Sequence, residues 1–301
     1  MPPSTHAFGI DVPVVPSRAP RRSGILRALS RDWPAGCAAA FLLLLVLATV
    51  GGARLTGYAY DHQDLDHTFS GPGAGRWVLG TDQYGRDLLT RILYGGRVSL
   101  AVGCAAVAAE SVLGVTWGTV AGFYGGRLDA AMMRIVDLLI AFPSLLLAVL
   151  VTGIFGPSLV NIVLALTMTA WPGMARTIRS EVVALRERDY IEAARALGAP
   201  PARMLVRHLV PNVVHLLAAR ATLDVSAIVL TEATLSFIGI GVQPPRPSWG
   251  LMISESFQSL QSHPYLVVVP AAVLSVTVLS FNLLGEAIAE WADPKLRRRT
   301  A

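Results

Sequence analysis

Five carboxylates interrupt long hydrophobic stretches of this 301-residue chain: Glu110, Asp137, Asp224, Glu232 and Glu286. An ionisable group in hydrocarbon is costly, so it usually faces the interior of a helix bundle or water. Asp137 and Asp224 each follow an arginine, Arg134 and Arg220, at helical ion-pair spacing, and structural pairing is the favoured interpretation for both. Interhelical polar contacts are expected for Glu232 and Glu286. Glu110 lies in mid-segment and either faces a pore, which we favour, or bonds Ser111.

The chain contains no arrangement of residues typical of a catalytic or metal site. Its six histidines lack metal-ligand spacing, and neither Gly-x-Ser-x-Gly nor His-Glu-x-x-His occurs. The single lysine, Lys295, lies between Pro294 and Leu296, so the chain has no P-loop. We therefore predict that it binds no metal or cofactor and catalyses no reaction. If ATP energises its activity, a separate subunit must bind ATP and Mg²⁺.

A basic helix–turn–helix hairpin at residues 189–212 has the features of a surface that another protein grips. Asp189 and Glu192 have the spacing of a capping box, which predicts a short helix with Asp189 as its N-cap. Gly198 is expected to end that helix in a left-handed conformation. The helix has one narrow apolar stripe at i, i+4 and i+7, formed by Tyr190, Ala194 and Leu197.

The second half of the hairpin begins at two prolines. Pro200 and Pro201 occupy positions that tolerate proline in the first turn of a helix. The helix that they start carries Arg203 and is expected to run to Pro211. Together with the short helix before it, this predicts a rigid projection on a basic loop.

The composition of the chain indicates the class of protein that positions these residues. Hydrophobic residues make up 53% of the chain and charged residues 15%, with a mean hydropathy of +0.54, which is typical of a membrane protein. A span needs about 20 residues to cross about 30 Å of hydrocarbon. The sequence therefore predicts an all-α, polytopic membrane protein with six transmembrane helices. They are expected at 33–56, 97–123, 131–155, 157–179, 212–239 and 264–288.

Basic residues orient the chain, because Lys and Arg near the ends of spans are retained in the cytoplasm. If the N-terminus lies in the cytoplasm, most of the 25 Lys and Arg residues lie on the cytoplasmic side as well. Both termini and the hairpin are therefore predicted to be cytoplasmic, in a chain that crosses the inner membrane. Individual arginines beside the membrane also contact anionic lipids. Nucleic acid is not an expected partner.

The expected spans divide the chain into five parts. The first helix is interpreted as an uncleaved anchor, because the segment before it is too long and polar for a signal peptide. The parts are a basic N-terminal tail (1–32), a first transmembrane helix (33–56), an extracytoplasmic segment (57–96), a core of five transmembrane helices (97–290) that includes the hairpin (180–211), and a C-terminal tail (291–301).

Several motifs carry a resemblance to a known family. Four of them are LGTDQYGRDLLTRILYGGRVSL (79–100), GFYGGRLDAAMMRIVDLLIAFPSLLLAVL (122–150), LTEATLSFIGIGVQPPRPSWG (230–250) and ADPKLR (292–297). In the hairpin, Glu192-Ala193-Ala194, then Gly198 and a run ending at Pro211, resembles the EAA coupling loop of ABC importer permeases. Together the motifs resemble the dipeptide/oligopeptide/nickel permease family, above all its C-type subunit.

This resemblance implies a type I ABC importer permease fold and a subunit that forms half of a pore. It implies a second permease in a heterodimer, two cytoplasmic ATPase subunits that bind ATP and Mg²⁺, and an extracytoplasmic substrate-binding protein. Peptides are the favoured substrate, with nickel or another small solute as the alternative. The residues expected to couple the chain to the ATPases are Asp189, Tyr190, Glu192, Ala193, Ala194, Leu197, Gly198, Arg203 and Pro211.

Two segments on the extracytoplasmic side, opposite the hairpin, are further candidates for functional surfaces. Residues 240–263 contain Pro244 and Pro245, which limit flexibility, and Trp249, expected at interfacial height. This segment is interpreted as a periplasmic gate or docking site, or equally as a plain re-entrant turn. Residues 79–96 are expected to form an amphipathic helix on the surface that leads into the second span.

Two other functional classes remain as alternatives. An ATP-independent secondary transporter would need elements such as paired broken helices in inverted repeats, and the sequence shows no convincing internal repeat. A membrane scaffold without transport activity could also display a docking hairpin, but it would have less reason to carry carboxylates in several spans. Flux without ATP would favour the first class, and partner binding without flux the second.

Overall fold

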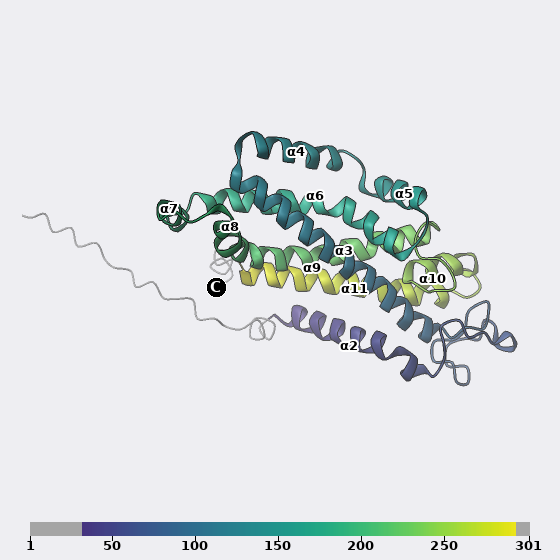
Figure 1. The fold of residues 1–301 in the computed structure, drawn as a ribbon. Helices are drawn as coiled ribbons and strands as arrows, with labels where there is room; N and C mark the ends of the chain where they lie inside the picture. The colour runs from purple at the N-terminus through teal and green to yellow at the C-terminus, as the bar shows by residue number, and fades with distance from the viewer. Residues whose placement is uncertain (1–31, 293–301) are drawn as a thin grey trace, which may run out of the picture.

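The computed structural model describes residues 32–292, and within them the regular secondary structure is helical apart from two isolated β-bridges. The all-α class predicted from the sequence is confirmed. Long helices run side by side, and short ones gather at the two ends (Figure 1). The long ones are α2 (Trp33–Thr56), α3 (Leu88–Tyr124), α4 (Gly126–Ile140), α5 (Ser144–Phe155), α6 (Leu159–Arg186), α9 (Val210–Phe237) and α11 (Tyr265–Ala292). The short ones are η1 (Leu65–His67), α7 (Asp189–Ala196), α8 (Pro201–Met204), the π-helical η2 (Leu205–Leu209), α10 (Trp249–Ser256) and η3 (Phe257–Ser259).

Close contact between α3 and α6 forms the centre of the bundle. Gly114, Gly118 and Gly122 of α3 face α6 at intervals of four residues, and a Cβ atom at any of them would press against α6. At Gly122 that atom would lie 2.9 Å from the carbonyl oxygen of Arg179. Small residues at this spacing let helix backbones approach closely, which explains why these two helices pack along most of their length.

The other helices pack around this pair. α9 contacts α3, α6 and α11, while α2 covers α3 and α11. α5 lies against α6, and α4 contacts both α3 and α6. The largest hydrophobic cluster joins all of these helices except α4, through buried side chains such as Ala106 of α3, Ile162 of α6 and Val229 of α9.

Three helices, α2, α3 and α11, are long and apolar enough to cross a membrane, and two bent pairs of helices bring this number to five. The predicted span 131–155 is one such pair and is wrong as a single helix, because α4 and α5 meet at 85°. Pro143 explains the break, since proline disfavours helical geometry in the residue before it. α6 is less apolar than these helices, because polar residues such as Asn161 and Arg176 lie within it.

A buried cluster of charges shows that the predicted surface helix at 79–96 is wrong. α3 begins at Leu88, and Arg91 lies in its first turns with almost no exposed surface. Arg86 Nε and Arg91 Nη1 lie 2.6 and 2.8 Å from Asp82 Oδ2. Both guanidinium groups also reach Glu255 Oε2 of α10, at 3.3 and 2.7 Å. The two arginines therefore connect the start of α3 to α10 inside the protein.

Candidate functional site

The predicted coupling residues lie together at one end of the bundle, formed by α7, α8 and η2 and called here the hairpin end. The start of α2 and the end of α11 lie at the same end, whereas α10 and residues 57–87 form the opposite, α10 end (Figure 1). The tails 1–31 and 293–301, with Lys295, lie outside the described residues. Most coupling residues are exposed: Asp189, Tyr190, Glu192, Ala193, Leu197, Gly198, Arg203 and Pro211, with Ala194 half-buried.

The start of α7 differs from the predicted capping box. Arg188, with φ −83° and ψ 142°, is the N-cap, and no side chain caps the helix there. Asp189 is already the first helical residue, so its carboxylate cannot accept the hydrogen bond expected of an N-cap. Asp189 and Glu192 instead place two negative charges in the first turn, where they interact favourably with the helix dipole.

The end of α7 has the left-handed glycine that the sequence predicts. Gly198 has a φ of +77°, and its N–H donates to the carbonyl of Arg195 at 3.0 Å. The N–H of Ala199 donates to the carbonyl of Ala194 at 3.1 Å. These two bonds form a Schellman motif, which fixes the direction of the chain as it leaves the helix.

The apolar stripe on α7 faces outward, and a residue that the sequence analysis missed anchors the helix. Tyr190 is 44% exposed and Leu197 is 88% exposed, whereas Ile191 is fully buried. Ile191 packs in a cluster that includes Met174 of α6 and Met204 of α8. The burial of Ile191 between two helices explains how α7 is held while Tyr190 and Leu197 remain available for contact. Ile191 lies outside that stripe, and a large apolar side chain on a different face of the helix was the sign in the sequence of its buried position.

The second helix of the hairpin does not end at Pro211 as predicted. α8, η2 and α9 follow one another without a break, and Pro211 lies in the first turn of α9. Proline cannot donate a backbone hydrogen bond and clashes with the carbonyl four residues earlier, and the π-helical turn η2 widens the helix at that point. The hairpin therefore passes directly into a long helix, with a bend of 57° between Pro201–Val214 and Leu216–Phe237.

Glu232 makes interhelical contacts inside the bundle. It is fully buried on α9 and accepts hydrogen bonds from Ser99 Oγ of α3 at 2.8 Å and from Ser236 Oγ at 2.7 Å. Ser236 in turn accepts a hydrogen bond from the N–H of Val242 at 3.0 Å. This network joins α3 to the C-terminal part of α9 and to the chain that leads into α10.

The other four carboxylates have different surroundings. Asp224 pairs with Arg220 Nε at 2.7 Å, as their spacing indicates. Asp137 pairs instead with Arg176 Nη2 of α6 at 2.6 Å, so the expected partner, Arg134, is wrong.

Glu286 and Glu110 make no hydrogen bonds with other described residues. Glu286 is exposed on α11, in place of the predicted interhelical contact, and has no ion pair within residues 32–292. Glu110 is fully buried on α3, and neither of its carboxylate oxygens has a hydrogen-bond partner there, which excludes the bond to Ser111.

The residues of the predicted gate separate into two environments. Pro244 and Pro245 are exposed at the α10 end. Trp249 is fully buried, and its Nε1 donates to the carbonyl of Ile92 at 3.1 Å. The first turn of α10 packs into the bundle and brings this ring against α3, so Trp249 is a packing residue of the α10 end.

Comparison with known proteins identifies the family. Residues 114–298 match the family of binding-protein-dependent transport system inner membrane components. The chain belongs to this family. Membership, together with the apolar helices of the bundle, makes it a multi-pass membrane subunit of a transport system.

Individual members are similar over most of the chain. The dipeptide transport system permease DppC of Alkalihalophilus pseudofirmus is 39% identical over 257 residues, which cover 85% of this chain and 83% of the relative. The oligopeptide permease OppC of Bacillus subtilis is 37% identical, covering 85% and 84%. The glutathione permease GsiD of Pectobacterium atrosepticum is 38% identical over 272 residues, covering 90% of each chain.

A solved transporter shares the fold. An inward-facing structure of the MetNI methionine ABC transporter has a TM-score of 0.55 and 20% sequence identity, covering 67% of this chain and 96% of that one. The type I permease fold implied by the sequence motifs is confirmed by this similarity.

Proposed function

We propose that this chain is the permease subunit of an ATP-driven importer and forms half of a pore through which peptides enter the cell. A second, related permease completes the pore as a heterodimer. Two cytoplasmic ATPase subunits bind ATP and Mg²⁺, and an extracytoplasmic binding protein delivers the peptide. The chain itself binds no cofactor and catalyses no reaction, and its termini and hairpin end face the cytoplasm.

The observation that carries the proposal is the construction of the hairpin end. α7 is held by the buried Ile191 and stopped by the Schellman motif at Gly198, yet it presents Tyr190 and Leu197 outward. Exposed apolar side chains on a stiff, anchored helix are suited to a protein partner. Because α6 leads into this helix and α9 leads out of the hairpin, a partner that moves it moves two helices of the bundle.

Peptides are the substrate favoured by the relatives. Relatives that are 37–39% identical are named for dipeptide, oligopeptide and glutathione transport, and all three substrates contain amide-linked amino acids. Nickel is less favoured, because within residues 32–292 no group of three or more His, Cys, Asp or Glu side chains is placed to hold a metal ion.

The coupling role of the hairpin is tested by replacing Gly198 with valine in the assembled importer. A left-handed conformation costs a residue with a Cβ atom about 1–2 kcal/mol, and more when the side chain is β-branched. We expect the importer to assemble and hydrolyse ATP while the amount of peptide imported per ATP falls severalfold. Both quantities are measured in proteoliposomes with a radiolabelled dipeptide.

A matched control is Gly153→Val on α5. Gly153 has open space around its Cβ position and no left-handed φ, so the same substitution leaves coupling unchanged there. An unchanged ratio of peptide to ATP in Gly198→Val would overturn the coupling role. Flux of peptide without ATP in the wild-type protein would favour a secondary transporter, and uptake of nickel instead of peptide would reassign the substrate.

A further inference from the structure

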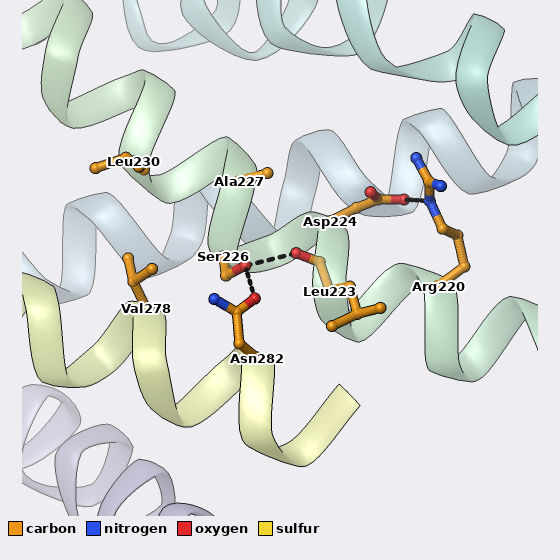
Figure 2. A pocket seen from close by; sticks show the side chains of 8 residues that line it. All are labelled: Arg220, Leu223, Asp224, Ser226, Ala227, Leu230, Val278 and Asn282. Carbon is orange, nitrogen blue, oxygen red and sulfur yellow. Dashed lines mark hydrogen bonds and ion pairs between the residues drawn. The ribbon is translucent and has the colours of Figure 1, made fainter. Parts of the chain in front are cut away.

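A hollow of about 410 Å³ lies between α9 and α11, and the hairpin does not contribute to it (Figure 2). It is called here the α9 hollow. Its polar lining comes from two neighbouring helices and its apolar wall includes Leu230 and Val278. The polar side chains are Arg220, Asp224 and Ser226 of α9 and Asn282 of α11.

Arg220 and Asp224 place a donor and an acceptor side by side in the hollow. Arg220 uses Nε for its ion pair with Asp224 Oδ2, at 2.7 Å. The two terminal amino groups of Arg220 make no hydrogen bond with another described residue, and the side chain is 40% exposed. The guanidinium is therefore free to donate further hydrogen bonds to a ligand next to the Asp224 carboxylate.

Asn282 adds an amide group to the same lining. The hydroxyl of Ser226 lies 2.6 Å from Asn282 Oδ1 and 2.7 Å from the carbonyl oxygen of Leu223, as Figure 2 shows. The contact with Ser226 fixes the orientation of the Asn282 side chain, because it engages the amide oxygen. Its amide nitrogen, which has no hydrogen-bond partner within residues 32–292, remains a donor for a carbonyl group.

Glu110 of α3 interacts electrostatically with two residues that line the hollow, Asp224 and Arg220. Its carboxylate is fully buried and has no hydrogen-bond partner among the described residues for either oxygen. Burying a carboxylate without a partner is costly. A cationic group that enters the hollow beside Asp224 lowers this cost, because a nearby positive charge stabilises the ionised form of the Glu110 carboxyl group.

We propose that the α9 hollow is a transient binding site for the free amino terminus of a peptide in transit. The terminal ammonium binds beside Asp224, close enough to interact electrostatically with Glu110, and Arg220 donates to the first carbonyl oxygen. Asn282 donates to the next carbonyl along the backbone. Every peptide has these groups regardless of its side chains, so the site fits a passage that accepts many sequences. The inference rests on the proposed import of peptides.

The test compares a peptide with its N-acetylated form in the assembled importer in proteoliposomes. The probes are alanine peptides that the wild-type importer carries in both forms, and uptake by each variant is divided by wild-type uptake of the same peptide. This ratio cancels any preference of the binding protein. Asp224→Asn is expected to lower uptake of the free-amine peptide about tenfold, the loss expected for one charged hydrogen bond, and to leave the acetylated form unaffected.

Asp137→Asn is the matched control, because it makes the same chemical change in an exposed ion pair between α4 and α6. It is expected to leave both uptake ratios near one. Equal losses for the two peptide forms in Asp224→Asn, or no loss at all, would overturn the amino-terminal site. Failure of the wild-type importer to carry any peptide, while carrying another solute, would overturn the proposed function instead.

A second variant tests whether the hollow lies on the path, without altering any charge. Ala227 is exposed on α9 and lines the hollow, so Ala227→Leu narrows it while leaving Arg220 and Asp224 in place. We expect this variant to assemble normally and to lose uptake of both peptide forms severalfold. Wild-type uptake by a correctly assembled Ala227→Leu importer would exclude the hollow from the path.

Discussion

Arginines at the hairpin end and at the α10 end of the bundle differ in burial and in ion pairing. At the α10 end, Arg86 and Arg91 are buried and share Asp82 and Glu255. At the hairpin end, Arg195 and Arg203 are exposed and form no ion pair within residues 32–292. The buried cluster satisfies its charges internally, whereas the two exposed arginines remain available to a partner or a lipid surface. Arginine therefore has a structural role in the first cluster and is exposed for contact in the second.

The largest expected effect comes from removing one arginine at each end. Arg91→Ala leaves Asp82 and Glu255 buried with one partner fewer, which is expected to cost about 3–5 kcal/mol of stability. Arg195→Ala removes an exposed charge and is expected to change stability by less than about 0.5 kcal/mol. Thermal unfolding of the purified importer measures both. Equal shifts in Tm for the two variants would show that the ends are not built differently.

A smaller difference is expected from adding one methyl group to a glycine at each end. A Cβ atom at Gly250 of α10 would lie 2.5 Å from the Cα of Ala233, so Gly250→Ala forces α10 away from α9 at a cost of about 1–3 kcal/mol. Gly198→Ala meets open space and has only its left-handed backbone to strain, at about 1 kcal/mol. Gly250→Ala should therefore lower Tm more, and the reverse order would contradict the packing described for α10.

The smallest expected effect is a pH dependence of stability at the α10 end, caused by Glu255. Burial raises the pKa of Glu255 above its ordinary value of 4.5, and the charge of Asp82 adds to this, while the charge and hydrogen bond of Arg86 lower it. A raised pKa means that the folded protein holds this proton more tightly than the unfolded chain. The resulting stability is fully present below pH 4.5 and is lost as pH rises through the folded pKa.

Glu255→Gln tests this dependence, because glutamine has no proton to lose. We expect the Tm of the wild-type protein to fall relative to that of Glu255→Gln as pH rises from 4.5 through neutrality. A difference between the two Tm values that stays constant over this range would contradict the raised pKa. The measurement requires only thermal unfolding of both proteins in a series of buffers.

Local sequence patterns predicted the features that depend on neighbouring residues. The helical class, the first and last spans and the left-handed Gly198 all follow from composition, hydropathy and a single glycine. The break between α4 and α5 also had a local signal in Pro143, which the length of the apolar stretch 131–155 obscured.

Two features that depend on distant residues were predicted incorrectly. The segment 79–96 has the charge pattern of a surface helix, but Glu255 lies more than 150 positions further along the chain and neutralises its arginines in the interior. Asp137 likewise pairs with Arg176 of α6 rather than with its helical neighbour Arg134. Helical spacing identifies which side chains could meet within one helix, and only packing decides whether another helix supplies a better partner.

The three glycines that join α3 to α6 have a mechanical consequence. Backbones in direct contact leave little room for side chains to yield, so the two helices move as one rod. With 37 residues and about 1.5 Å of rise per residue, α3 is on the order of 55 Å long. One end of this rod is embedded in the charge cluster that holds α10, and the other lies beside the segment of α6 that leads into α7. We therefore expect a tilt imposed at the hairpin end to be transmitted along this rod to the α10 end.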